Sequence, residues 1–329
     1  MTLLSVADLC VTLDTPDGPA PILQDVSFDL GAGGSLGIVG ESGCGKSMTA
    51  LALMGLLPAQ ARAKGEIRFE GENLLALPEA ALCKVRGRRL AMVFQEPMTA
   101  LNPVKTIGFQ VAEGLRWHLG LSRGAAEARA VKLLARVGLP QPRFSPGLYP
   151  HQLSGGQRQR VVIAMALACE PALLIADEPT TALDVTSQAA ILDLLAEVTE
   201  AAGLALLLIT HDLAVVWQNT ARMLVMYAGR VVERGATPAV FDRMAHPYTR
   251  GLFAASPGAL DAPLPPGRRL ATIPGQVPDP RQRPAGCVFA GRCPRAQDDC
   301  LPAQPEERAL DAAHGVACLH PCLEEEDAR

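Results

Sequence analysis

Two groups of residues combine side chains and spacing that suit phosphate chemistry. The first, Gly-Glu-Ser-Gly-Cys-Gly-Lys-Ser from Gly40 to Ser47, fits the phosphate-loop pattern G-x-x-x-x-G-K-[ST]. Glycines let a loop wrap phosphates with backbone N–H groups, and the N-terminus of the following helix adds positive potential. The lysine neutralises phosphate charge, and the last hydroxyl reaches Mg²⁺. We expect a nucleotide to contact Gly40, Ser42, Gly43, Gly45, Lys46 and Ser47.

The second group is a pair of carboxylates, Asp177 and Glu178, directly after the apolar run 173–176. Four apolar residues that end in two acids describe a buried strand that delivers both carboxylates to one edge of a sheet. Taken alone, such a pair is commonly only a solvated strand end. Together with a phosphate loop, it predicts that Asp177 holds the shell of Mg²⁺ and that Glu178 polarises the attacking water.

Two further polar residues follow apolar runs. Gln95 comes after Met92-Val-Phe94, and His211 comes after 206–209 and Thr210. His211 is a candidate contact to the γ-phosphate, and Gln95 is a candidate sensor of the metal or of the water. A lone histidine or glutamine at a strand end is more commonly structural, so both assignments depend on the phosphate loop.

A second anion-binding element is predicted at Ser154-Gly155-Gly156-Gln157, which precedes the helical run 158–165. Serine and glycine at the start of a helix favour an N-terminus that binds an anion. Two phosphate-binding elements in one chain are redundant unless they serve different nucleotides. The pattern therefore favours a site that a second subunit completes.

Composition narrows the class of protein. The chain has 329 residues, a net charge of −4 and no run of Lys and Arg, so a general nucleic-acid surface is excluded. The start lacks the basic and apolar stretches of a secretory signal. The longest apolar runs are shorter than the roughly 18–20 residues that a spanning helix needs. We expect a protein that does not cross the membrane itself.

The order of apolar patterns predicts an α/β fold. Strand-like runs at 36–39, 90–94, 172–176 and 204–210 alternate with helical segments at 46–57 and within 106–138. Such alternation is typical of a mainly parallel sheet. After about residue 256 prolines and glycines multiply, which predicts a separate, loop-rich tail. No internal repeat is visible.

The phosphate loop, Gln95, Ser154–Gln157, the acid pair, Ala182-Leu-Asp184 and His211 resemble the ATP-binding cassette family in type and order. The resemblance covers 1–250 and implies a P-loop core at about 35–95 and 160–235. It further implies an antiparallel N-terminal sheet and a helical subdomain at about 96–158. Lys46, Ser47 and Asp177 are then implied to bind MgATP, and Glu178 to act as catalytic base. Gln95 is implied to contact the metal and to link the site to the membrane partner.

The same resemblance implies roles for the other positions. His211 corresponds to the switch histidine, and Asp184 communicates across a dimer interface. Ser154, Gly155, Gly156 and Gln157 close over ATP that is held by the other subunit. The family usually stacks an aromatic ring on adenine, and the matching position here is Leu13. Loss of the ring predicts a loss of affinity of about 1 kcal/mol.

Longer stretches resemble the ATPase subunits of dipeptide and oligopeptide importers, among them 93–103, 149–153, 176–186 and His246-Pro-Tyr-Thr249. The resemblance implies a second ATPase subunit (a heterodimer), two transmembrane permease subunits and an extracytoplasmic binding protein. It places the chain at the cytoplasmic face of the membrane. Nickel and glutathione importers share much of this sequence, so they remain alternatives. A non-transport cassette ATPase and a metal-binding regulator are the other candidates.

Five of the nine cysteines lie in the last 43 positions. Cys287-x5-Cys293-x6-Cys300-x17-Cys318 offers four soft thiolates, which favour Zn²⁺ or an iron–sulfur cluster. The spacing matches neither short zinc-finger pairs nor ferredoxin runs, and unligated reduced thiols are the third alternative. Gly286–Pro294 resembles the extension of peptide-importer ATPases at 251–329, which implies a [4Fe–4S] cluster in preference to zinc. We expect a structural role, the stapling of a tail too proline-rich to build a core.

Overall fold

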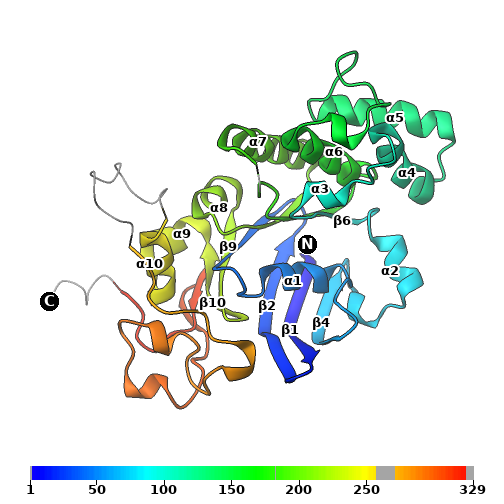
Figure 1. Cartoon of the computed structure of the whole chain (residues 1–329). Coiled ribbons are helices and arrows are strands. Elements are labelled where there is room, and N and C mark those ends of the chain that lie inside the picture. Colours follow the sequence, from blue (N-terminus) through cyan, green and yellow to red (C-terminus); the bar gives the residue numbers. More distant parts are fainter. Residues whose placement is uncertain (1, 182, 257–270, 324–329) are drawn as a thin grey trace. The chain divides into compact units, whose positions relative to one another are not determined.

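Figure 1 shows the computed structural model, which describes residues 2–181, 183–256 and 271–323. The chain forms two compact units. The helical unit comprises Gly31–Gly34 and Ala76–Leu207. The phosphate-loop unit comprises Thr2–Leu30, Ser35–Leu75 and the described residues from Leu208 on. The prolines of 257–266 that the sequence singled out lie outside the described residues.

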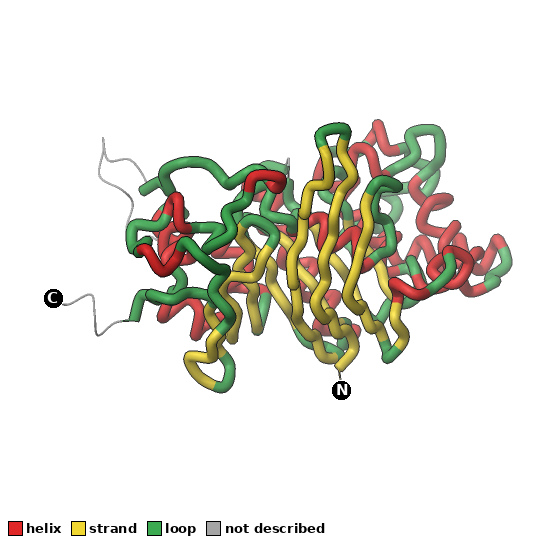
Figure 2. The backbone as a smooth tube through the Cα atoms, turned by 90° about the horizontal axis from the view of Figure 1, so that it is seen from below, coloured by secondary structure: helices red, strands yellow, loops and turns green. Residues whose placement is uncertain are grey.

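The N-terminal sheet belongs to the phosphate-loop unit, and its long strands lie side by side in Figure 2. β1 is antiparallel to β4, as the sequence predicted. Along β2, buried Val26, Phe28 and Leu30 alternate with more exposed residues, the two-residue period of a half-buried strand. In sheet order they are β2 (Gly18–Gly31), β1 (Thr2–Thr15), β4 (Ala61–Phe69) and β5 (Glu72–Asn73).

A second sheet of the phosphate-loop unit carries the loop itself. β3 and β9 are parallel, and almost every residue in them is buried, as expected for an apolar strand covered on both faces. β10 is antiparallel to β9 and to β12. The order is β11 (Arg308–Asp311), β12 (His314–Val316), β10 (Arg230–Ala236), β9 (Arg222–Tyr227) and β3 (Ser35–Val39).

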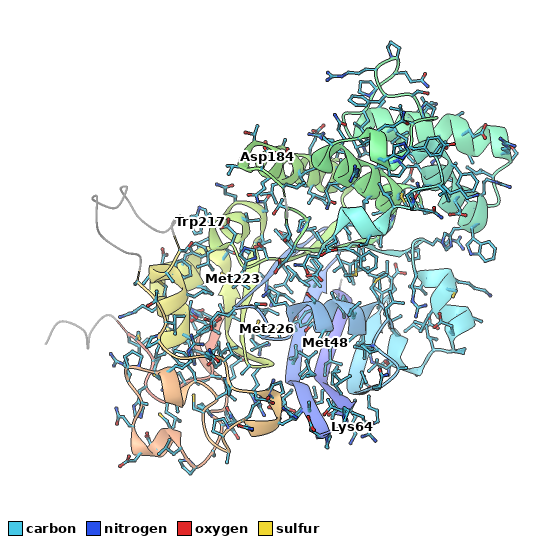
Figure 3. All side chains as sticks on the ribbon, in the orientation of Figure 1. Met48, Lys64, Asp184, Trp217, Met223 and Met226 are labelled. Atoms are coloured by element: carbon cyan, nitrogen blue, oxygen red, sulfur yellow. The ribbon has the colours of Figure 1, made fainter. Side chains whose placement is uncertain are left out.

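Among the described residues of this unit there are four α-helices: α1 (Lys46–Leu53), α8 (Leu213–Asn219), α9 (Thr237–Arg243) and α10 (Pro247–Ala254). α8 packs on β3, and α9 packs on β9 and β10. Trp217 on α8 is half-exposed and contacts Phe241 of α9 (Figure 3). His246 caps α10, because its Nδ1 accepts the N–H of Tyr248 at 3.0 Å and Pro247 takes the first helical position. The stretch His246–Thr249 is therefore the start of a helix.

The described residues 271–323, which we call the cysteine-rich segment, belong to the phosphate-loop unit. The prediction of a separate tail without a core was therefore wrong. Phe289 is only 1% exposed, and its ring centroid lies 5.1 Å from that of Tyr227 and 5.4 Å from that of Tyr248. β12 adds a further strand to β10. A segment rich in proline needs no core of its own when its one large aromatic ring enters a core that is already present.

The helical unit is built around α6 (Figure 1). α6 packs on β6 and on α3, α4, α5 and α7, and β6 is parallel to β7. α4 and α5 begin at serine or threonine caps, and α4 ends at Gly120 with a φ of +65°, which accounts for the helices predicted within 106–138. The elements are α2 (Glu79–Val85), β6 (Leu90–Val93), α3 (Pro97–Ala100), α4 (Ile107–Leu119), α5 (Arg123–Arg136), α6 (Gly155–Leu167), β7 (Leu173–Asp177) and α7 (Val185–Ala202).

β8 (Ala205–Ile209) leads the chain from the helical unit into the phosphate-loop unit. Among the described helices, none is both long enough and apolar enough to cross a bilayer.

Candidate functional site

The sequence-predicted site residues fall into two groups, one in each unit. The phosphate loop, between β3 and α1, takes its shape from two glycines. Gly40 has a φ of +155° and Gly45 a φ of +107°, a region that L side chains rarely adopt. A Cβ on Gly40 would collide with the carbonyl oxygen of Met226, and a Cβ on Gly45 would collide with Leu23. Only glycine fits both positions.

Lys46 and Ser47 open helix α1 directly after these glycines. Gly45 is the N-cap and offers no side-chain acceptor to the first turn of α1, so backbone N–H groups and not a capping side chain define the helix start. Lys46 is 5% exposed, and its Nζ donates to the carbonyl oxygens of Gly40 at 2.8 Å and Glu41 at 3.2 Å. The loop therefore closes around the ammonium group, which concentrates positive charge at the place where the sequence predicts phosphate.

The turn between β9 and β10 is hydrogen-bonded to the phosphate loop and to β2. The N–H of Gly229 donates to the carbonyl oxygen of Cys44 at 2.9 Å, and the carbonyl oxygen of Gly229 accepts the N–H of Gln24 at 2.9 Å. Cys44 itself is fully buried, and burial raises the pKa of its thiol. The thiol is therefore a neutral packing group within the loop.

His211 leaves the sheet beside the strand that leads into the phosphate loop. The N–H of Thr210 donates to the carbonyl oxygen of Ile38 in β3 at 3.1 Å, and His211 follows as an exposed residue. Asp212 then caps α8, because its Oδ1 accepts the N–H of Ala214 at 2.8 Å. The imidazole is thus held between a strand end and a capped helix. Its assignment to the γ-phosphate stays a prediction.

The helical unit contains the carboxylates and the glutamine. β7 is buried along its whole length, and Asp177 at its end is 4% exposed. Glu178 has a φ of +46°, a strained conformation for a residue with a side chain. Its Oε2 accepts the amide of Gln95 at 3.1 Å and the hydroxyl of Thr181 at 3.0 Å. The structure therefore brings Gln95 and Glu178 together, and Thr181 is a positioning residue that the sequence reading missed.

Ser154 begins α6 with a reciprocal capping box. Its Oγ accepts the N–H of Gln157 at 3.4 Å, and the Oε1 of Gln157 accepts the N–H of Ser154 at 2.9 Å. A hydroxyl that accepts one hydrogen bond still has its own hydrogen to donate. The cap therefore fixes the serine without using its hydroxyl hydrogen, as a phosphate contact requires.

Asp184 caps α7, and Figure 3 labels this residue. It lies close to Ser154–Gln157, which we call the signature loop; α6, which begins there, is the signature helix. Its carboxylate accepts the N–H of Ser187 at 3.0 Å and the hydroxyl of Ser187 at 2.7 Å, and these bonds lower the pKa of Asp184. A Cβ on Gly156 would lie 3.2 Å from the hydroxyl oxygen of Ser187. The cap of α7 thus adjoins the start of α6. Ala182, which belongs to the same predicted motif, lies outside the described residues.

A buried glutamine links the signature helix to the carboxylate strand. Gln159 is fully buried, and its Nε2 donates to the carbonyl oxygen of Pro179 at 2.7 Å. Pro179 directly follows Glu178. Gln159 therefore joins α6 to the residue that follows the predicted catalytic base, and no local sequence pattern pointed to this link.

The four predicted cysteine ligands gather in the phosphate-loop unit. Cys287, Cys293, Cys300 and Cys318 line one small cavity together with His246 and His320. Burial is the main cause that raises the pKa of Cys318 to about 12, and the neighbouring thiols of Cys287 and Cys293 contribute. Cys322 is buried nearby, but it does not line the cavity.

The spacing of the ligand atoms around this cavity is uneven. Within the described part of the chain, the ligand atoms of Asp299, Cys300 and His320 all lie within 4.8 Å of one another. No three of the four thiols form a group of this kind among the described residues. His320 Nε2 lies 2.8 Å from Asp299 Oδ1. The four thiols thus line one cavity, and the described ligand atoms that lie closest together there are those of Asp299, Cys300 and His320.

Two further residues contact the phosphate loop and were missed by the sequence reading. The hydroxyl of Tyr248 accepts the N–H of Glu41 at 2.8 Å. The guanidinium of Arg292, next to Cys293, binds the carboxylate of Glu41 at 2.7 and 3.1 Å. Both lie in stretches that carry the resemblance, Tyr248 in His246–Thr249 and Arg292 in Gly286–Pro294, but neither was predicted to contact the phosphate loop. Leu13, the predicted adenine neighbour, lies half-buried on β1, and its role stays a prediction.

Comparison with known proteins agrees with this geometry. The family model for the ABC transporter matches residues 23–181, and the model for the oligopeptide/dipeptide transporter C-terminal region matches residues 232–300. The oligopeptide transport ATP-binding protein OppD of Escherichia coli is 50% identical over 98% of this chain and 94% of its own length. A putative peptide import ATP-binding protein of Brucella abortus is 49% identical over 92% of this chain and 90% of its own.

Solved structures give the same result for the cassette. The dimeric, post-hydrolysis ATP-binding cassette MJ0796 bound to ADP and Pi has a TM-score of 0.63 at 29% identity, covering 71% of this chain and 98% of that chain. The cbiO1 protein of Clostridium perfringens, part of the ABC transporter complex cbiONQ, has a TM-score of 0.62 at 28% identity, covering 73% of this chain and 91% of that chain.

A phosphate loop on a parallel sheet, an acid pair at the end of a buried strand and a serine-capped signature helix define a cassette ATPase. The chain belongs to the ABC transporter family of ATP-binding cassettes. Residues 232–300 also match the C-terminal region of the oligopeptide and dipeptide transporters.

Proposed function

We propose that this chain is the ATP-hydrolysing subunit of an importer for dipeptides and oligopeptides. The observation that carries the proposal is the near full-length match to peptide transport ATP-binding proteins, at 50% identity over 98% of the chain for OppD of Escherichia coli. The match to the peptide-transporter C-terminal region over 232–300 supports the same cargo class over nickel or glutathione.

In the proposed reaction, Lys46 binds the phosphates of ATP, and Ser47, Asp177 and Gln95 hold Mg²⁺. The oxygen of a water molecule attacks the γ-phosphorus, and the bond from this phosphorus to the oxygen that bridges to ADP breaks. Glu178 takes the proton of the water, oriented by the hydrogen bonds from Gln95 and Thr181.

The proposed assembly places the chain on the cytoplasmic face of a membrane. Ser154, Gly155, Gly156 and Gln157 close over ATP held by a second ATPase subunit, and Asp184 lies at that interface. These four residues form the N-cap and first turn of α6, the helix labelled in Figure 1. Two permease subunits form the channel, and an extracytoplasmic binding protein delivers the peptide. We propose that the second ATPase subunit is a different chain, so that the two make a heterodimer.

Peptide uptake tests the cargo class. Cells that express the chain together with its permease subunits, partner ATPase and binding protein are expected to take up a radiolabelled tripeptide. Lys46→Ala should abolish this uptake, because the phosphate loop loses its cation. Nickel and glutathione uptake, measured in the same cells, serve as controls. Loss of nickel or glutathione uptake with peptide uptake unchanged would assign the chain to one of those importers.

We further propose that Cys287, Cys293, Cys300 and Cys318 hold a [4Fe–4S] cluster. A single zinc ion bound by thiolates at about 2.3 Å draws its ligand atoms close together, whereas a polynuclear cluster separates them. In the described chain, no three of these thiols have their sulfur atoms all within 4.8 Å of one another, although all four line one cavity. The bound group would supply a covalent link among four loops of the segment.

Purified without oxygen, the protein is expected to be brown, with an absorbance band near ~400 nm that iron–sulfur centres give. Cys293→Ala should remove the colour, because it deletes a thiolate that lines the cavity. Cys83→Ala is the matched control, since Cys83 is exposed on α2 and belongs to the other unit. Colourless protein that contains one zinc per chain would replace the cluster by zinc.

A further inference from the structure

Arg292 connects the cysteine-rich segment to the phosphate loop through one guanidinium group. Its Nη1 and Nη2 bind the Glu41 carboxylate at 2.7 and 3.1 Å in a bidentate pair. The side chain is only 6% exposed, and that of Glu41 is 29% exposed. Because the guanidinium is largely buried, water screens this ion pair less than it screens a fully exposed pair.

The same guanidinium is fixed by the segment from which it comes. Its Nε donates to the carbonyl oxygen of Pro274 at 2.7 Å, and Nη2 donates to that of Ile273 at 3.1 Å. Nη1 also donates to the hydroxyl of Tyr227 at 3.3 Å. All donors of this fork are directed either at the segment or at the phosphate loop and its supporting strand. Lysine could not reproduce this set, because it has no planar fork.

Glu41 is the second residue of the phosphate loop, and three of its groups make hydrogen bonds that hold the loop in place. Its N–H donates to the hydroxyl of Tyr248, its carbonyl oxygen accepts Nζ of Lys46 at 3.2 Å, and its carboxylate binds Arg292. Glu41 therefore stands between the lysine that is aimed at phosphate and the cysteine-rich segment. Without its partner, the carboxylate would present an unpaired negative charge next to bound phosphates.

Cys293 follows Arg292 directly and lines the cysteine cavity. Its N–H donates to the carbonyl oxygen of Ala290, in a short 3-10 turn, Ala290–Arg292, that contains the arginine. A change that displaces Cys293 therefore also displaces the guanidinium. The phosphate loop and the cysteine cavity are thus joined over one peptide unit.

From these contacts we infer that Arg292 is a positioning residue that makes nucleotide affinity depend on the folded cysteine-rich segment. The inference rests on the proposed function in that the phosphate loop binds the nucleotide. Arg292 neutralises Glu41 and holds the first turn of the loop in the shape that receives phosphate. Disruption of the segment withdraws Arg292, after which the loop loosens and the Glu41 charge repels phosphate.

Nucleotide titration of the purified full chain tests this inference, with MgADP as the probe so that no turnover intervenes. Arg292→Gln is expected to weaken MgADP binding by about tenfold, the scale on which single residues alter coupling between sites. Adding Glu41→Gln to this variant should recover affinity to within about threefold of the starting chain, because the unpaired charge is removed. A residue that only stabilised the fold would give no such recovery.

Two controls accompany the titration. Arg281→Gln removes another arginine of the same segment, one that pairs with Asp17 and Asp279 and not with the phosphate loop, and it should leave the affinity unchanged. Arg292→Lys keeps the charge but loses the fork, and an intermediate loss is expected. This variant decides the question if Arg292→Gln fails to fold by circular dichroism.

The dependence on the segment is tested with Cys293→Ser, alone and combined with Arg292→Gln. Alone, it should weaken MgADP binding; in the Arg292→Gln background, it should cause no further loss, since the connection is already cut. Unchanged affinity in Arg292→Gln, or fully additive losses in the double variant, would overturn the inference. Failure of the starting chain to bind MgADP, or an unchanged affinity in Lys46→Ala, would instead contradict the proposed function.

Discussion

Replacing Glu178 with glutamine is expected to lower the rate of ATP hydrolysis by about 10²- to 10⁴-fold, the usual contribution of a general base. Gln95 and Thr181 donate to the same carboxylate oxygen, so the orientation of Glu178 is fixed. Glutamine keeps the shape of the side chain but cannot take the proton of the attacking water. Nucleotide binding should persist, because the phosphate loop is unchanged.

Phosphate release from MgATP by the chain assembled with its partner subunit measures this effect, beside a titration of nucleotide affinity. Glu170→Gln is the matched control. Glu170 lies in the same unit, also has a positive φ of +52°, and pairs with Arg129 on the surface. A Glu178→Gln variant that hydrolyses ATP within twofold of the normal rate would remove the carboxylate from the mechanism.

Local sequence patterns predicted those parts of the site whose conformation is encoded within a few residues. The phosphate loop needs glycine at Gly40 and Gly45 because both positions have positive φ and no room for a Cβ. The start of α6 needs Ser154 and Gln157 because each caps the other across a single turn. In both cases the residue type and the backbone conformation determine each other, so the pattern alone was sufficient.

Contacts between distant parts of the chain left no such pattern. Gln95 and Glu178 are 83 positions apart, and Glu41 and Arg292 are 251 apart. An arginine in a proline-rich segment has the same appearance in the sequence whether it is solvated or ion-paired. Only the fold reveals that Arg292 reaches the phosphate loop, and the same holds for the hydroxyl of Tyr248.

The error about the C-terminal segment has a related cause. Composition averaged over a window reports prolines and glycines, and it gives little weight to a single phenylalanine. Phe289 contacts Tyr227 and Tyr248, which come from a strand and a helix of the cassette. The apolar partners of the segment were therefore outside any window that contained it. Local composition therefore underestimates how much of a segment is buried when its apolar partners lie in distant parts of the sequence.

The signature loop gives the second large expected effect. Gly155→Asp should lower ATP turnover of the assembled ATPase by about 10²-fold or more, the scale on which loss of one preorganised anion contact acts. Gly155 is the first residue of α6, where the helix N-terminus favours an anion. A carboxylate at this position would cancel the positive potential of the helix N-terminus, and it would repel the phosphates of the nucleotide on the partner subunit. A Cβ here lies 3.3 Å from Leu183, so a small shift accommodates it.

Turnover with the partner subunit is compared with MgADP affinity of the isolated chain, which should not change because its own phosphate loop is intact. Gly124→Asp is the matched control: it places the same carboxylate in the first turn of α5, where no atom lies within 4 Å of the added Cβ. Equal turnover in the Gly155→Asp and Gly124→Asp variants would mean that α6 meets no nucleotide. A loss of MgADP affinity in the isolated Gly155→Asp chain would mean that the signature serves its own subunit, since only then could the change act without a partner.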